Sequence, residues 1–304
     1  MDLLAAFRTF VRISETGSFS AVAREVGATQ PAISRQVAQL EEHLGARLFQ
    51  RSTRSLALTE DGRDLMPHAR HVLEAVEETE SAIGRRKASP SGTVRLGCPS
   101  VFGRLYVAPR IGSLLARYPD LSVELSVADD VQDMVLAGLD LSVRVGDITD
   151  ASLVARRIGS AVGQTIASID YLDRMGEPQH PDDLANHECI VFTRSADHDR
   201  WVFEGADGPV TVQVQGRMKS NDIEAVLAAA VGGLGISRVP VWMMRDQLAA
   251  GRVRRVLGGW RAQSRPIYAV YPSRRFLAPR TRAMIDFLVD EFRLDPLISA
   301  YGET

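Results

Sequence analysis

The chain has 304 residues, 45% of them hydrophobic and 24% charged, and a formal net charge of −2. These values are typical of a globular protein with two or three compact units, and the small net charge says little about partners. Two cysteines, Cys98 and Cys189, exclude a disulfide framework and lack the spacing of metal ligands, so we expect no metal. The first residues include Asp2 and no long apolar core, unlike a signal peptide, and no stretch approaches the roughly twenty apolar residues of a bilayer span. We therefore expect a cytoplasmic protein that does not contact membranes.

Residues 18–27 predict a short helix followed by a tight turn. Ser18 is suited to cap this helix, because its hydroxyl can accept a hydrogen bond from a free backbone amide of the first turn. Gly27 supplies the turn. The apolar positions expected to face the core are Phe19, Val22 and Val26.

A second helix is predicted directly after this turn. Thr29 is its expected cap, and Pro31 lies in its first turn, where a missing amide hydrogen costs nothing. Four apolar residues recur at i, i+4, i+7 and i+11 and form a stripe that must face a core. They are Ile33, Val37, Leu40 and Leu44.

The start of this second helix has a chemistry suited to DNA. The residues that lie there, off the apolar stripe, are Gln30, Pro31, Ser34 and Arg35. A glutamine can bond adenine through two hydrogen bonds, an arginine can reach guanine or phosphate, and a helix N-terminus attracts phosphate. The pattern predicts a helix-turn-helix whose second helix enters the major groove. The alternative is a pair of surface helices with ordinary caps.

The flanking segments favour DNA binding over that alternative. A predicted amphipathic helix before the motif would complete a three-helix core. The residues that indicate this helix are Leu3, Phe7, Phe10, Val11 and Ser14. Residues 51–59 alternate like a two-stranded wing, whose Arg51 and Arg54 can enter the minor groove or contact the backbone. Residues 1–59 hold seven Arg against five Asp or Glu, a net charge of +2, so tight binding requires the basic side chains to share one face.

From residue 60 to residue 83 the pattern is that of one long helix with a heptad seam. The seam consists of Leu65, Ala69, Val72, Val76, Thr79 and Ile83. Because a monomer cannot cover such a seam in water, it predicts pairing with a second copy of the chain. The alternative is packing against the chain's own regulatory domain. Pro67 is expected to bend this helix or to mark an early turn, and residues 85–92 to form a hinge.

Beyond Gly92, short β runs alternate with helical stretches, which predicts an α/β fold with parallel sheets. The expected strands are Val94–Gly97, Leu121–Val127, Leu141–Val145, Cys189–Phe192, Val210–Gln215, Gly235–Val239 and Ile267–Tyr271. The expected helices lie near Leu105–Tyr118, Val131–Gly138, Ile223–Val231, Val241–Ala250 and Arg280–Arg293. The size of this region suggests two lobes with a cleft between them.

The stretch from Phe7 to Gly62, which includes FSAVAREVGATQPAISRQVAQLEEHLGARLFQRSTR, resembles the winged helix-turn-helix of LysR-type transcriptional regulators. The resemblance extends nearly to the C-terminus through DLSVRVGD, GGLGI and AVYPSRR, and it is similar to the CrgA and DmlR branch of the family. It implies DNA contacts by the start of the recognition helix and by the wing. The matching positions are Thr29, Gln30, Pro31, Ser34, Arg35, Arg51 and Arg54.

The resemblance also implies a domain plan. Residues 1–59 would form the winged DNA-binding domain, 60–91 the linker and dimerisation helix with its hinge, and 92–304 a two-lobed effector domain with a periplasmic-binding-protein-like (type 2) fold. Lobe I would comprise 92–162 and 267–304, and lobe II 163–266. The linker helices would pair two protomers, and a dimer of dimers would bind a pseudo-palindromic promoter site in double-stranded DNA, with RNA polymerase as a further candidate partner.

An effector is expected where strands end and helices begin, because ligands of open α/β sheets bind there. The positions nominated are Ser100, Val101, Asp129, Phe192, Thr193 and Asn221. Each could equally be a capping or packing residue. Asp130 adds a further acid, which disfavours a strongly anionic effector. A small organic acid is what the family resemblance implies, and no other cofactor is expected.

Other functions have less support in the sequence. Cys98 next to this cleft invites a redox role, but low-pKa thiols need nearby cations and only Arg104 is close, so a buried structural side chain is the alternative. A transport protein with the same fold would need a signal peptide. An enzyme would need an activated nucleophile, paired acids or a metal cluster, and we find no catalytic residues.

Overall fold

The computed structural model describes residues 1–51, 56–83, 89–194, 198–272 and 277–298, without the side chains of residue 51 and of several residues from 74 onward in the long helix. The chain forms two compact units. Unit 1 consists of Met1–Gly97, Ile111–Ser142 and Tyr271–Met284, and unit 2 of Cys98–Arg110, Val143–Val270 and Ile285–Thr304. Within the described residues no helix is long and apolar enough to cross a membrane.

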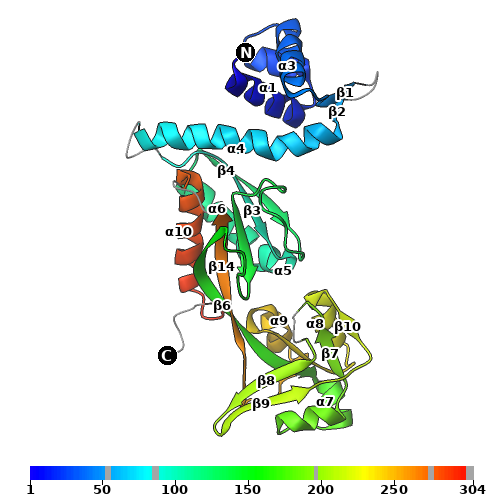
Figure 1. Ribbon diagram of the computed structural model, residues 1–304. Coiled ribbons are helices and arrows are strands. Elements are labelled where there is room, and N and C mark those ends of the chain that lie inside the picture. Colours follow the sequence, from blue (N-terminus) through cyan, green and yellow to red (C-terminus); the bar gives the residue numbers. More distant parts are fainter. Residues whose placement is uncertain (52–55, 84–88, 195–197, 273–276, 299–304) are drawn as a thin grey trace. The chain divides into compact units, whose positions relative to one another are not determined.

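Unit 1 begins with a three-helix bundle and a small two-stranded sheet (Figure 1). Its elements are α1 (Leu3–Thr16), α2 (Phe19–Glu25), α3 (Gln30–Leu44), β1 (Phe49–Arg51), β2 (Leu56–Leu58) and the long helix α4 (Glu60–Ile83). The predictions of a leading helix, a helix-turn-helix, a wing and a long helix are confirmed. Side chains of all these elements meet in one core, in which Phe10, Val22 and Leu40 are fully buried.

Two apolar positions of the predicted motif lie outside this core. Val26 is 55% exposed because α2 ends at Glu25, one residue earlier. Leu44 is 41% exposed because it is the last residue of α3, directly before Gly45 turns the chain in the left-handed region at φ 67°. The sequence pattern was therefore right for the interior of each helix and wrong at its C-terminal end.

The heptad seam of α4 is buried in the core of the bundle at some positions and exposed to solvent at others. Ala69 is fully buried in the core of the bundle and Leu65 packs at its edge, so these two side chains contact their own chain. Ala69 is therefore not accessible to a partner helix, and pairing through the rest of the seam stays a prediction. Val72 is 37% exposed, and the side chain of Ile83 lies outside those described. The helix continues through Pro67 without a break.

The part of the chain after residue 91 contains a large sheet whose strands β3 (Gly92–Cys98), β5 (Leu141–Val145) and β14 (Ser264–Pro272) contribute residues to both units. In unit 1, β3 lies between β5 and β4 (Leu121–Val127) and pairs with β5 in parallel, with Leu96 opposite Leu141. Gly97 in β3 gives the Leu139 side chain room, because a Cβ atom there would lie 2.7 Å from the end of that side chain, which would have to shift.

In unit 2 the strand order is β10-β7-β11-β6-β14, with β12 also paired to β6. These strands are β6 (Leu153–Ser168), β7 (Cys189–Phe192), β10 (Lys219–Ser220), β11 (Ile236–Pro240) and β12 (Val253–Arg255). The strand β11 runs parallel to β7 but antiparallel to β6, with Arg238 opposite Thr165. The prediction of parallel sheets is therefore wrong: the sheet is mixed, because β6 runs against its neighbours β11 and β12.

The remaining strands and the helices of this part of the chain are as follows. A separate antiparallel sheet has the order β13-β8-β9, from β8 (Arg200–Gly205), β9 (Gly208–Gln213) and β13 (Arg261–Ala262). The helices are α5 (Ser100–Phe102), a π-helical turn (Gly103–Val107), α6 (Ala108–Arg117), α7 (Ile169–Met175), α8 (Ile223–Val231), α9 (Arg245–Ala249) and α10 (Pro279–Arg293). Two 3-10 turns, Pro181–Asn186 and Val241–Met243, complete the elements of the described chain.

The predicted helix at Val131–Gly138 does not form. This segment makes turns instead, because the Asp133 carboxylate accepts hydrogen bonds from the amides of Val135 (2.8 Å) and Leu136 (3.0 Å). An aspartate side chain that bonds the following amides offers the backbone an alternative to the helix. Val131 and Leu136 are left 78% and 68% exposed.

Candidate nucleic-acid interface and ligand site

The helix-turn-helix is held by caps that the sequence largely predicts. The Ser18 hydroxyl accepts from the Ala21 amide at 3.2 Å, and Gly27 adopts φ 65° in the turn. Thr29 occupies the cap position of α3, but its side chain makes no capping hydrogen bond. The first turn of α3 is instead closed by the Thr29 carbonyl, which accepts from the Ala32 amide at 3.0 Å. The expected Thr29 side-chain cap is therefore wrong.

The start of α3 presents a polar face outward. Ile33 and Val37 are buried beneath it, whereas Gln30, Pro31 and Arg35 are exposed and Ser34 is half-buried. The Gln30 side-chain oxygen accepts from the Ser20 hydroxyl at 3.1 Å, which orients the amide and leaves its NH₂ group for a partner. Within the described residues, Arg35 makes no ion pair. These groups are donors suited to base edges and phosphates.

Three acidic side chains of this domain are paired with neighbouring groups. Glu41 accepts from the Leu48 amide at 2.8 Å and pairs with Arg47 at 3.1 Å. Arg12 contacts Glu25 at 2.9 Å and Glu15 at 2.8 Å, and these hydrogen bonds, with Glu25 first, raise its pKa. The modest net charge of +2 in this domain therefore comes from its other basic side chains, which are not used in these pairs.

The wing is an antiparallel pair, in which Phe49 lies opposite Leu58 and Arg51 opposite Leu56. The predicted contact residue Arg51 thus ends strand β1. The other wing arginine, Arg54, lies outside the described residues. The two-stranded form of the wing is confirmed, and the DNA contacts of its arginines stay a prediction.

Three predicted ligand residues come together where β7 and β10 end in unit 2. Ser220 lies opposite Phe192, and the Thr193 amide donates to the Ser220 carbonyl at 2.8 Å. The Asn221 carbonyl accepts from Arg194 Nε at 2.9 Å. Phe192 and Thr193 are half-buried and Asn221 is exposed, so all three can reach a ligand.

The segment after β3 lies close to this strand edge. Ser100 is half-buried at the helix start, while Val101 is only 3% exposed and belongs to the core. An ion pair between Arg104 and Glu224, in the first turn of α8, joins this segment to the residues around Asn221. Sequence reasoning missed the pair: Arg104 follows Ser100 by one helical turn, and Glu224 follows the Asp222 cap by two residues, but nothing in the sequence connects them.

Two further positions behave differently from the cluster. Asp129, after β4, is half-buried in unit 1, whereas the other ligand positions belong to unit 2. Cys98 is 4% exposed, and burial raises the pKa of its thiol to about 12. A thiol that stays protonated is a poor redox sensor, which favours the structural alternative.

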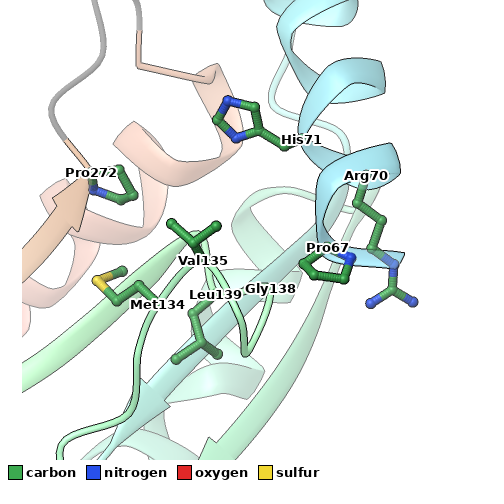
Figure 2. Close-up of a pocket in the computed structure, with 8 residues that line it drawn as sticks. All are labelled: Pro67, Arg70, His71, Met134, Val135, Gly138, Leu139 and Pro272. Atoms are coloured by element: carbon green, nitrogen blue, oxygen red, sulfur yellow. The ribbon is translucent and has the colours of Figure 1, made fainter. Parts of the chain in front are cut away.

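A small pocket, partly open to solvent, lies in unit 1 beside α4 (Figure 2). Figure 2 shows Pro67 and His71 of α4 on one side of the pocket. Met134, Val135 and Leu139, from the segment after β4, lie on the other side. None of the predicted ligand residues lines this pocket.

Comparison with known families agrees with this architecture. Residues 4–63 match the bacterial regulatory helix-turn-helix protein model of the lysR family, and residues 87–293 match the LysR substrate binding domain. A DNA-binding domain followed by a substrate-binding domain defines a transcriptional regulator rather than an enzyme. The chain belongs to the LysR family of bacterial transcriptional regulators.

Individual relatives cover nearly the whole chain. An HTH-type transcriptional regulator of Xanthomonas campestris is 35% identical over 94% of this chain and 84% of its own length. The transcriptional activator AaeR of Escherichia coli is 31% identical over 96% and 94%. Among solved structures, CrgA of Neisseria meningitidis has a TM-score of 0.60 at 28% identity, covering 94% of this chain and 98% of its own. Full-length AphB, a virulence activator of Vibrio cholerae, has a TM-score of 0.58 at 28% identity, covering 95% and 99%.

Proposed function

We propose that this protein is a ligand-responsive regulator that binds a pseudo-palindromic promoter site as a dimer of dimers, through Thr29, Gln30, Pro31, Ser34, Arg35 and the wing arginines. The observation that carries the proposal is the start of α3, where exposed Gln30 and Arg35 stand over a buried apolar stripe. The domain plan proposed is 1–59 for DNA binding, 60–91 for the linker and 92–304 for the effector. Action on promoter DNA places the protein in the cytoplasm, with RNA polymerase as a candidate partner.

The effector is a small organic acid bound by the cluster around Ser100, Phe192, Thr193 and Asn221. Support comes from their position at the ends of strands, where ligands of α/β sheets bind, and from the match of residues 87–293 to a substrate-binding family. The effector shifts the effector domain between two arrangements, and the linker helices transmit that shift to the recognition helices.

Dimer pairing uses the outer part of α4. Val72 is exposed and Val76 half-buried, whereas Leu65 and Ala69 are committed to the core of their own domain. The seam that pairs protomers is therefore shorter than the sequence pattern and begins after Ala69.

Fluorescence anisotropy with the intergenic DNA upstream of its own gene tests this function. We expect binding that survives scrambled competitor DNA and weakens as salt rises, with a log–log slope of roughly −0.9 for each phosphate contacted. Absence of binding even to non-specific DNA at low salt would contradict the proposal.

A further inference from the structure

The helix that follows β3 is held in two different ways along its length. On either side of Arg104, Phe102 and Tyr106 pack around Trp242, with ring centroids 5.5 Å and 5.4 Å from the indole. Phe102 also contacts Phe292 at 5.4 Å, and Arg110 binds Asp295 at 3.0 Å. The aromatic contacts are buried, the Arg110–Asp295 pair is partly buried, and together they fix the helix. The ion pair between Arg104 and Glu224 is the second attachment, and it is exposed.

The exposed pair links two segments far apart in sequence. The Arg104 side chain is 60% exposed and the Glu224 side chain 45% exposed. In the part of the chain that the structure describes, Glu224 is the carboxylate that Arg104 contacts. An exposed ion pair contributes little net stability because water screens it, so a second carboxylate can replace the first at small cost. The pair is thus a weak attachment next to a strong one.

Arg104 lies in a π-helical turn, Gly103–Val107, between α5 and α6. Such turns are rare and are frequently found at functional sites, because the wider turn redirects the side chains it carries. The start of α8, which Arg104 contacts, already carries negative charge. The Asp222 side chain caps α8 by accepting from the Glu224 amide at 2.8 Å, so two acids lie in and beside the first turn of α8. An anionic ligand at this place would bind Arg104 rather than the start of α8.

We propose that Arg104 and Glu224 form a clasp beside the ligand site, and that a carboxylate effector binds by taking the place of Glu224 on Arg104. Displacement of Glu224 releases the start of α8 from the Ser100–Val107 segment, while the aromatic cluster around Trp242 keeps the helix in place. Arg104 is then a specificity residue for the effector, and Glu224 is a built-in competitor. This inference rests on the proposed function, since it identifies how the same site selects and responds to its ligand.

Hydrogen exchange of the full-length protein without ligand tests the clasp. Glu224→Gln should raise the exchange rate of amides in residues 222–227 by about two- to fivefold, the range expected for an exposed pair. The charge swap, Arg104→Glu with Glu224→Arg, should restore wild-type protection. Arg156→Gln is the control, because Arg156 and Asp286 also form an exposed pair, 45% and 52% against 60% and 45%, between β6 and α10. Equal protection in wild type and Glu224→Gln, or failure of the charge swap to restore it, would overturn the clasp.

Benzoate and its neutral isostere benzamide, each at tens of millimolar, test the ligand half of the proposal. Benzoate should increase exchange at residues 222–227 in the wild type, benzamide should not, and Arg104→Gln should abolish the benzoate effect. Equal effects of the two compounds, no effect of benzoate, or an unchanged benzoate effect in Arg104→Gln would overturn the role of Arg104.

DNA binding by the same variants separates this proposal from the proposed function. Loss of the exchange differences with DNA binding intact would sink the clasp alone. Absence of DNA binding in the wild type would instead remove the regulatory function, whatever the exchange data show.

Discussion

At the start of α3, Arg35 is exposed and makes no ion pair within the described residues, whereas Arg104 at the ligand site is bound to Glu224. The candidate DNA surface exposes Arg35 and the Gln30 amide group, and acids of the same domain such as Glu41 accept hydrogen bonds from backbone amides. The ligand site satisfies its own charges. A polyanion as long as DNA can be recognised by a preformed surface, but a small effector produces a response only if it binds one arrangement of the protein better than another. The predictions that follow test each side of this contrast.

The largest effect is expected from the core that holds the recognition helix. Leu40 is fully buried and Leu44 is 41% exposed at the end of the same helix. Leu40→Ala should destabilise the winged domain by about 2–5 kcal/mol, because it leaves a cavity, and Leu44→Ala by no more than about 0.5 kcal/mol. Thermal melting followed by circular dichroism measures the difference. The three tryptophans, Trp201, Trp242 and Trp260, belong to unit 2, so their fluorescence transition should stay unchanged in both variants.

The second prediction concerns the two buried thiols, Cys98 and Cys189. Burial raises the pKa of both Cys98 and Cys189 to about 12, so at pH 8.5 the folded protein holds roughly a thousandfold less thiolate than an unfolded chain with a thiol pKa of about 8.5. Alkylation by iodoacetamide should be slow in the native protein and rapid in urea. Because the folded pKa is raised, the associated stability is complete below about pH 8.5 and is lost as the pH rises toward 12. Rapid native labelling of Cys98 would reopen a redox role.

The outer part of α4 gives a smaller effect. Val72→Asp should weaken the dimer about tenfold or more, because the charge would be buried against the partner helix. Val154→Asp, on β6, is the control, since Val154 is 36% exposed against 37% for Val72. Sedimentation velocity over a concentration series measures dissociation. A dimer as stable as the wild type in Val72→Asp would mean that α4 does not pair.

The smallest expected effect is a difference in the free energy of unfolding between variants of the two helix caps, Ser18 and Thr29. The Ser18 side chain caps α2, whereas the Thr29 side chain makes no capping bond. Ser18→Ala should therefore lower the free energy of unfolding by about 1 kcal/mol, and Thr29→Ala should leave it nearly unchanged. Urea unfolding monitored by circular dichroism compares them. Equal losses in both variants would show that Thr29 stabilises α3 through its side chain after all.

The sequence predicted the helices and strands well where the hydrophobic period and the capping or turn residues indicate the same bounds. The strands at Leu121–Val127, Leu141–Val145 and Cys189–Phe192 and the helix at Ile223–Val231 have the predicted bounds. The long strand β6 was missed, because its glycines and arginines hide the alternation. Gly159 in β6 is needed for a tertiary reason, since a Cβ atom there would lie 2.6 Å from the Ile298 side chain.

The candidate site was predictable only in part. Strand ends and caps located Ser100, Thr193 and Asn221, because those signals are local. The Arg104–Glu224 pair joins residues 120 positions apart, and no spacing in a single sequence reveals such a contact. Burial of Ala69 was hidden for the same reason: a heptad pattern states that a face is covered, but not by which helix.

DNA binding by Arg35→Ala tests the central claim most directly. The measurement is fluorescence anisotropy against the upstream DNA and against scrambled DNA, with Arg282→Ala on α10 as a control that removes the same charge far along the chain. We predict that Arg35→Ala loses about 1–3 kcal/mol of binding to the specific DNA without changing oligomeric state, while Arg282→Ala binds like the wild type. Unchanged affinity in Arg35→Ala, or an equal loss in both variants, would contradict the assignment of α3 as the helix that reads DNA.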